Sequence, residues 1–132
     1  MNYLLDTHTF LWTVSNTENL SKKALEIIKN LKNEIYISAV SFWEISIKTR
    51  LKKLNLDKIE PEELLTLAEK MDFQVISLTP EEAITYHKLK EETHNDPFDR
   101  MLIWQSISRN MTILSKDQEF YKFVPYGLKL IW

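Results

Sequence analysis

The 132-residue sequence contains no cysteine and only one glycine, Gly127. Without cysteine the chain can form no disulfide, no thiolate metal site and no cysteine nucleophile. An average composition would supply about nine glycines in this length. Rossmann fingerprints, P-loops and the G-x-S-x-G elbow all need glycines, so the sequence excludes these motifs. Nucleotide-cofactor chemistry of the usual kinds is therefore not expected.

Long apolar segments and a strong charge of one sign are also missing. The longest apolar run, Met101–Trp104, is too short to span a bilayer. The amino terminus has no basic region, and Asp6 interrupts its first apolar stretch, unlike a signal peptide. The 17 basic and 19 acidic residues give a formal net charge of −2, whereas proteins held to nucleic acid by bulk charge are usually more basic. We expect a cytoplasmic protein with no membrane partner.

The rest of the composition is that of an ordinary globular protein. Hydrophobic residues make up 44% of the chain and charged residues 27%, a balance typical of a folded domain. No repeat, low-complexity tract or flexible linker divides the sequence. Its length is sufficient for one substantial core, so we predict a single domain over residues 1–132.

Strand-like and helix-like segments alternate along the chain. Helix starts are indicated by Ser21, by Pro61, by the capping box that begins at Thr79 and by Asp96, while Asn110 can end a helix in the left-handed conformation. Short strands are predicted at residues 3–5, 35–37, 73–76, 111–114 and 128–132. This alternation predicts an α/β fold, a three-layer sandwich with a mainly parallel central sheet of about five strands flanked by helices. The order of the strands is left open.

Carboxylates follow the predicted strands. Asp6 comes directly after the first strand, and Asp117 follows the fourth after two residues. Asp96 and Asp99 lie at a helix N-terminus, and Glu44 lies in the first turns of the helix after the second strand. In a parallel sheet these positions share the carboxyl edge, where ligands of open α/β sheets bind. We therefore expect these acids to converge on one pocket.

Clustered carboxylates need a counter-charge, because like charges raise each other's pKa. Oxygen ligands without sulfur or imidazole suit Mg²⁺, with Mn²⁺ as a substitute. A metal ion at such a site activates water and stabilises charge at a phosphodiester. The acidic edge therefore predicts metal-dependent hydrolysis.

Each acid also has a purely structural explanation. Asp96 and Asp99 fit a helix N-cap and its partner, and Ser41–Glu44 has the form of a capping box. Asp6 and Asp117 are suited to loops or caps. One alternative is thus a non-catalytic binding module, and another is a phospho-acceptor or phosphatase-like domain with Asp6 as nucleophile and a lysine beside the phosphate. The joint position of the acids favours the metal site.

Four stretches of the sequence also resemble the acidic motifs of PIN-domain nucleases. The third, with the sequence HNDPFDRMLI, is the most specific, and the order and spacing of all four extend the resemblance over nearly the whole chain. The similarity is to the VapC-like toxins of bacterial and archaeal toxin–antitoxin pairs. In chain order the stretches are Tyr3–His8, Ser38–Lys48 with Leu51–Leu56, His94–Ile103 and Leu114–Asp117.

The resemblance implies a PIN-like fold and a Mg²⁺-dependent endoribonuclease that acts as a toxin. A metal-activated water would hydrolyse the RNA phosphodiester. The resemblance also implies a homodimer and a small cognate antitoxin that wraps the active site. The family's catalytic acids fall on Asp6, Glu44, Asp99 and Asp117. Asp6 and Asp99 would be the chief metal ligands, and the other two would complete the acidic pocket.

Further residues are expected around these acids. The resemblance places Asp96 beside the site as an N-cap. The hydroxyl of Thr7 is expected to orient Asp6, and Ser115, where the family more often has threonine, is expected to orient a neighbouring carboxylate. Arg100, in the acidic turn, is the candidate contact for a substrate phosphate.

Histidines and tryptophans near the acids have more ordinary interpretations. His8 and His94 form no His-x-x-x-His pair, so we expect polar residues rather than ligands or bases. Tryptophans can stack on bases, yet Trp43, at helical spacing with apolar neighbours, is more typical of a core or an interface. Trp12 and Trp104 are candidates for a dimer or antitoxin surface.

Overall fold

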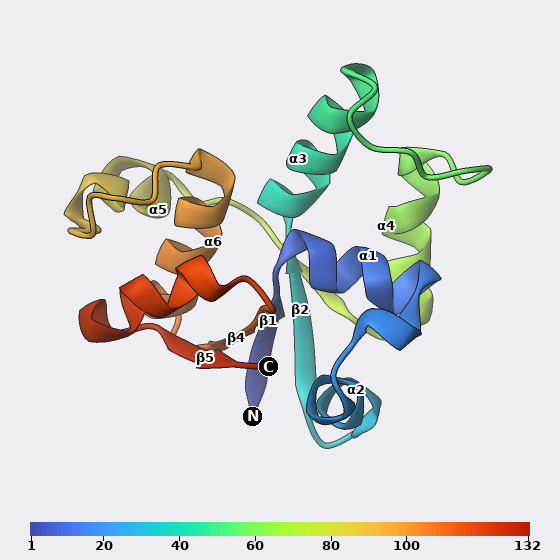
Figure 1. Ribbon diagram of the computed structural model, residues 1–132, viewed down its shortest axis with the longest axis horizontal. Coiled ribbons are helices and arrows are strands. Elements are labelled where there is room, and N and C mark those ends of the chain that lie inside the picture. Colours follow the sequence, from blue (N-terminus) through green and yellow to red (C-terminus); the bar gives the residue numbers. More distant parts are fainter.

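A central sheet of five parallel strands organises the molecule, which a computed structural model describes over residues 1–132 (Figure 1). The strand order is β3-β2-β1-β4-β5. The expected α/β architecture is therefore confirmed, and each expected strand is present to within one or two residues at its ends. The strands are β1 Asn2–Leu5, β2 Glu34–Ser38, β3 Gln74–Ile76, β4 Thr112–Leu114 and β5 Lys129–Ile131.

Six α-helices and three 3₁₀ segments connect the strands. None of the helices is long and apolar enough to cross a membrane. The helices are α1 Thr7–Ser15, α2 Lys22–Lys29, α3 Ala39–Arg50, α4 Pro61–Lys70, α5 Pro80–Thr85 and α6 Pro97–Ser108. The 3₁₀ segments are η1 Thr17–Asn19, η2 Tyr86–Lys88 and η3 Gln118–Tyr126.

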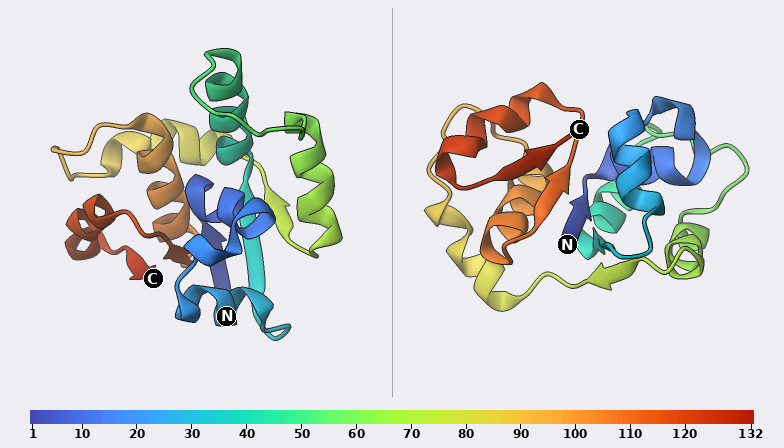
Figure 2. Two further views of the ribbon diagram at one scale, coloured as in Figure 1. Left: turned by 45° about the vertical axis from the view of Figure 1, so that its right-hand side comes forward. Right: turned by 90° about the horizontal axis from the view of Figure 1, so that it is seen from below.

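The core has two parts, one on each face of the sheet. Along β1, Tyr3 and Leu5 join one buried cluster and Leu4 joins the other, because successive side chains of a strand point to opposite faces. The first cluster includes Phe10 of α1 and residues of α3 and α4, whereas the second is built largely from α6 and η3. Seen from below, the orange and red segments lie on one side of β1 and the blue and green helices on the other (Figure 2).

The strand order places the carboxyl ends of β2, β1 and β4 side by side. β1 pairs in parallel with β2 on one side and with β4 on the other. The chain turns from β1 into α1 and from β2 into α3 at the same edge (Figure 1). Successive strands run outward from β1 to β3 on one side and through β4 to β5 on the other, so the direction of winding changes between β1 and β4. Ligands of open parallel sheets bind outside the strand ends at such a point.

Local sequence signals fix most helix ends. Thr79 and Glu82 form the expected capping box, Asp96 caps α6, and Asn110 has the left-handed φ of 55° that ends this helix. The capping box expected at residues 41–44 is wrong. α3 begins three residues earlier, with the Ser38 hydroxyl accepting the N–H of Val40 at 3.0 Å. Glu44 therefore lies inside the helix and is free for another role.

A buried polar network ties α5 and α6 to the end of β2. The Gln105 side chain accepts a hydrogen bond from Ser38 at 2.5 Å and donates to Glu82 at 3.0 Å. Arg109 donates to both oxygens of Glu82, at 2.7 and 3.0 Å. Burial alone would raise the pKa of Glu82, but the hydrogen bonds from Arg109 and Gln105 outweigh it and lower the pKa to about 2. The ionised form is thus the one that the fold stabilises.

Glu82→Gln should lower the free energy of unfolding at pH 7 by about 2 kcal/mol, because it removes the charge that Arg109 pairs with. A carboxyl with a depressed pKa stabilises the fold above its unfolded pKa of 4.5 and loses that contribution as the pH falls toward 2. Urea unfolding at pH 7 and pH 3 measures both effects. Glu81→Gln, at the exposed neighbouring position, is the matched control. An equal loss in both variants would contradict the role of the network.

Candidate functional site at the carboxyl edge of the sheet

Asp6 is held at the junction of β1 and β4. One carboxylate oxygen caps α1 by accepting the N–H of Thr9 at 2.8 Å, and the other accepts the hydroxyl of Ser115 at 2.5 Å. Its own N–H donates to the carbonyl of Leu114 at 3.2 Å. Burial raises the pKa of Asp6, although the hydrogen bonds from Ser115 and Thr9 oppose the shift. The carboxylate is therefore buried, oriented and without a cationic partner.

Glu44 is buried in α3 and reaches toward α1. One of its oxygens accepts the hydroxyl of Thr7 at 2.6 Å, and the other pairs with the ammonium of Lys48 one turn later. The Thr7 hydroxyl also lies 3.0 Å from that of Ser41. Thr7 thus orients Glu44, and the expectation that it orients Asp6 is wrong. The reason is that α1 and α3 start from neighbouring strands and their first turns face each other.

Asp99 lies in the first turn of α6. Its N–H is capped by the side chain of Asp96 at 3.0 Å, and its carboxylate lies 2.9 Å from Nε2 of His94. Burial raises the pKa of Asp99 to about 6; the hydrogen bond with His94 opposes this shift, and the charges of Asp96 and Glu44 add to it. The carboxylates of α3 and α6 are therefore near enough to repel one another.

Asp117 is exposed and caps η3 by accepting the N–H of Glu119 at 2.9 Å. Its side chain shares with Asp6 a pocket of about 270 Å³ outside the ends of β1 and β4. The remaining lining residues of this pocket are His8, Trp12 and Lys116. Of the four predicted catalytic acids, Asp117 is thus the most accessible to solvent. It lines the same pocket as Asp6, between the ends of β1 and β4.

The acids form two groups along one edge and do not meet in a single cluster. Asp6 and Asp117 lie outside β1 and β4, whereas Glu44 and Asp99 lie between α3 and α6. Thr7, next to Asp6 in the chain, connects the groups through its hydrogen bond to Glu44. No three histidine, aspartate or glutamate side chains are arranged to hold a metal ion. The structure therefore brings the predicted acids to one edge, but not into one coordination sphere.

The donor atoms at this edge nevertheless fit a divalent cation. They are carboxylate and hydroxyl oxygens, the ligands that Mg²⁺ and Mn²⁺ prefer. In the structure the positive charge beside these acids is the ammonium of Lys48. Partial burial would lower the pKa of Lys48, but Glu44, with smaller contributions from Asp96 and Asp99, raises it. A cation bound by these acids would compete with the Lys48 ammonium.

Arg100 has a structural role in place of the expected substrate contact. Its guanidinium is buried and donates to the carbonyls of Leu89 at 2.8 Å, Glu91 at 2.6 Å and His94 at 2.9 Å. The guanidinium also lies over the rings of Tyr86 and Phe123, at 5.6 and 5.7 Å from their centroids. Its hydrogen bonds hold the 89–94 loop, which presents the His94 ring to Asp99. The contact of His94 with Asp99 was not predicted, because only the spacing between histidines was considered. Its position five residues before Asp99, in the same acidic turn, was the signal in the sequence.

The model of the PIN domain family matches residues 3–124 of the chain. PIN domains are nucleases and generally use divalent metal ions. No curated protein sequence matches the chain significantly.

Solved structures show the same fold. The chain is similar to VapBC2 from Rickettsia felis bound to a promoter DNA fragment, with 18% identity, TM-score 0.72 and coverage of 100% of this chain and 99% of the other. DNA-bound VapBC from Salmonella typhimurium gives 19% identity, TM-score 0.70 and coverage of 99% and 97%. VapBC-5 from Mycobacterium tuberculosis gives 13% identity, TM-score 0.63 and coverage of 98% and 97%.

Asp99→Asn should stabilise the metal-free protein above about pH 6. Folding raises the pKa of this carboxyl from 3.8 to about 6, so the folded state retains a proton that the unfolded state has lost between these values. Stability therefore falls as the pH rises through this window, and the neutral amide avoids the loss, a gain of about 2 kcal/mol at pH 7.5.

Thermal unfolding in EDTA at pH 7.5 and pH 4 measures this gain. Asp117→Asn is the control, because Asp117 is exposed and asparagine caps a helix as well as aspartate does. A destabilised Asp99→Asn at pH 7.5, or the same gain at pH 4, would contradict the account of the site.

Proposed function

Because the chain belongs to the PIN domain family, whose members are nucleases, we propose that it is a Mg²⁺-dependent endoribonuclease and the toxin of a toxin–antitoxin pair. The observation that carries the proposal is the set of oriented carboxylates at the carboxyl edge, with Asp6 and Glu44 buried and Asp99 half-buried. The raised pKa values of Asp6 and Asp99 support it further, since strongly perturbed carboxylates cluster at functional sites.

Each acid has a distinct role in this proposal. Asp6 and Asp99 are the ligands for Mg²⁺, for which Mn²⁺ can substitute. These two acids would hold the cation, and its chemistry when bound would be to lower the pKa of a water and to offset the charge of the phosphodiester oxygens. Ser115 fixes the carboxylate plane of Asp6, and Thr7 fixes that of Glu44. Because the chain has no cysteine and no serine paired with histidine, hydrolysis by water suits these residues better than a covalent intermediate.

The similar structures suggest the partners. Those from Rickettsia felis and Salmonella typhimurium are described as VapBC complexes bound to DNA, and a further match is FitAB bound to a DNA fragment. By analogy we propose a small cognate antitoxin, a homodimer of this chain, RNA as the substrate and the cytoplasm as the compartment.

A second candidate function rests on Lys116. This lysine shares the pocket of Asp6, as a phospho-acceptor or phosphatase-like site with an aspartate nucleophile would require. Both oxygens of Asp6 already accept hydrogen bonds from the chain, which makes attack on phosphorus less favourable. Covalent labelling of Asp6 by acetyl phosphate, detected by mass spectrometry, would support this candidate over the nuclease.

The purified full-length chain should cleave RNA only in the presence of Mg²⁺ or Mn²⁺. We expect Asp6→Asn and Asp99→Asn each to lower the rate by about 100-fold or more, because each removes a charge that holds the cation. A pool of structured and unstructured RNAs, resolved on denaturing gels, provides the measurement.

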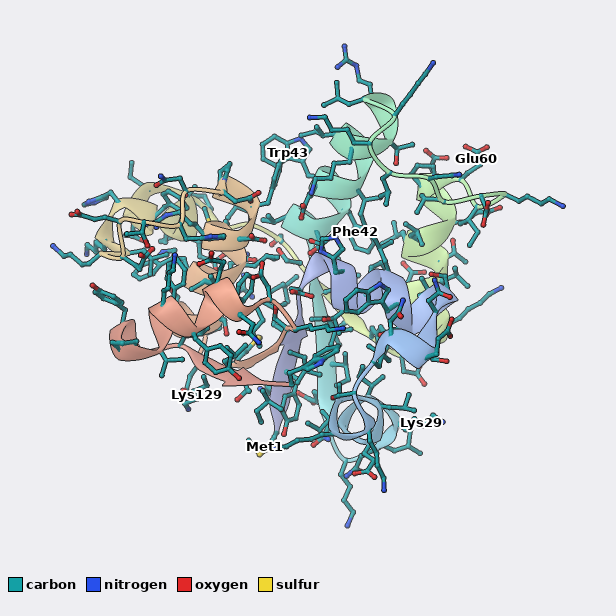
Figure 3. The ribbon with its side chains drawn as sticks, in the orientation of Figure 1. Met1, Lys29, Phe42, Trp43, Glu60 and Lys129 are labelled. Carbon is teal, nitrogen blue, oxygen red and sulfur yellow. The ribbon has the colours of Figure 1, made fainter.

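Glu60→Gln is the matched control, since this exposed acid caps α4 away from the carboxyl edge (Figure 3). It should cleave at the parent rate. Cleavage that persists in EDTA, or that survives in both aspartate variants, would refute the proposed site.

Lys48→Met should tighten Mg²⁺ binding by about tenfold, because the ammonium no longer neutralises the nearby carboxylates. The rise in melting temperature with added Mg²⁺ reports binding, since a ligand specific to the folded state stabilises it by mass action. Lys53→Met, which replaces an exposed lysine just beyond the end of α3, is the control. Equal or weaker binding by Lys48→Met would show that Lys48 does not compete with the cation.

A further inference from the structure

The pocket beside Asp6 has an aromatic wall with no assigned role. Trp12, half-buried in α1, lines this pocket together with His8. Its ring lies 5.9 Å from that of Trp132 and 6.0 Å from that of His8, measured between centroids. Packing against the rings of an adjacent helical turn and of the carboxyl-terminal residue fixes the orientation of the indole. The pocket therefore has a rigid π-surface as one of its walls.

A free positive charge lies over the same ring. The ammonium of Lys116 is 5.8 Å from the centroid of Trp12, and Lys116 forms no ion pair with a carboxylate. Lys116 stands between Ser115, which donates to Asp6, and Asp117, which shares the pocket. An aromatic surface and an exposed cation thus lie directly beside two of the acids at the carboxyl edge.

We propose that this pocket, the Trp12–Lys116 pocket, binds one unpaired nucleotide of the substrate, with its base stacked on Trp12 and a phosphate paired with Lys116. Aromatic side chains stack on the face of any base, and lysine neutralises backbone phosphate. The volume of about 270 Å³ is near the lower limit for small-ligand pockets and suits a single nucleotide. A base inside a duplex has no free face for the indole.

The inference rests on the proposed function and adds the residues that would hold one nucleotide of the substrate. Lys116 favours a nucleotide over an apolar segment of a protein, with the phosphate on the lysine side of the pocket and away from the carboxylates of Asp6 and Asp117. An apolar occupant would bury Lys116 and Asp117 without partners, which is costly, whereas a phosphate would pair with the lysine. The pocket would then position the chain of the substrate relative to Asp6 and Asp117.

Binding can be measured apart from cleavage. The full-length Asp99→Asn protein in EDTA provides an inactive background, and the probe is a fluorescein-labelled single-stranded RNA 12-mer followed by anisotropy. In this background Trp12→Leu should weaken binding by about tenfold, and Trp12→Phe by less than about threefold, because phenylalanine still stacks.

Lys116→Gln should weaken binding and also reduce the slope of the logarithm of the affinity against the logarithm of the salt concentration. The reduction should match the loss of about one phosphate contact.

The matched controls lie elsewhere. Trp43→Leu removes an exposed indole that packs on Phe98 in a different pocket, and Lys29→Gln removes an exposed lysine near the opposite end of the sheet (Figure 3). Both should bind the RNA within about twofold of the background. A duplex of the same sequence should bind more weakly and be indifferent to Trp12→Leu.

The outcomes separate this inference from the proposed function. RNA binding that is unchanged in Trp12→Leu and Lys116→Gln would overturn the pocket, even if the active chain cleaves RNA. Absence of binding by the background protein would overturn it as well. The predicted pattern of binding supports the pocket even if the active chain fails to cleave, a result that would instead refute the nuclease. If circular dichroism shows Trp12→Leu to be unfolded, the exposed Lys116→Gln decides the question.

Discussion

Burial of negative charge at the carboxyl edge is the constraint on which the rest of this structure depends. A carboxylate leaves water at a high cost unless hydrogen bonds or opposite charges replace its solvation. Asp6 receives two neutral donors, Ser115 and the backbone of Thr9, and its pKa remains raised. Glu44 receives a hydroxyl and an ammonium, whereas Asp99 receives one ring nitrogen. The site is incompletely neutralised, which is the electrostatic condition for binding a cation.

The surrounding structure supports these three acids from a distance. Arg100 and Glu91 fold the loop that places His94 on Asp99. The network of Glu82 and its partners fixes α6 against the end of β2, where α3 begins, and so sets the spacing between the carboxylates of α3 and α6. The ammonium of Lys48 is the internal counter-charge of Glu44. A divalent cation bound by these acids would replace that ammonium as the partner of Glu44.

Sequence alone predicted the features that depend on local chemistry or on strand direction. Alternating strands and helices gave the parallel sheet, and caps such as Asp96 gave the helix starts. Contacts between elements were harder to predict. The hydroxyl of Thr7 points to α3 because of strand order, which one sequence does not encode visibly. Trp43 has the spacing of a core or interface residue, and the structure excludes the core, because the residue is 59% exposed. Arg100 resembled a phosphate contact, but tertiary packing directs it to backbone carbonyls.

The most direct test of the account is a crystal structure of the full-length chain grown with Mn²⁺, with data collected at the manganese absorption edge. We predict an anomalous peak at the carboxyl edge, bound by oxygens of Asp6 and Asp99, with the ammonium of Lys48 displaced from Glu44. Such a peak would show that the two groups of acids close around a cation. A fully occupied peak elsewhere, or no peak while Lys48 remains on Glu44, would contradict the claim that these acids form a metal-dependent nuclease site.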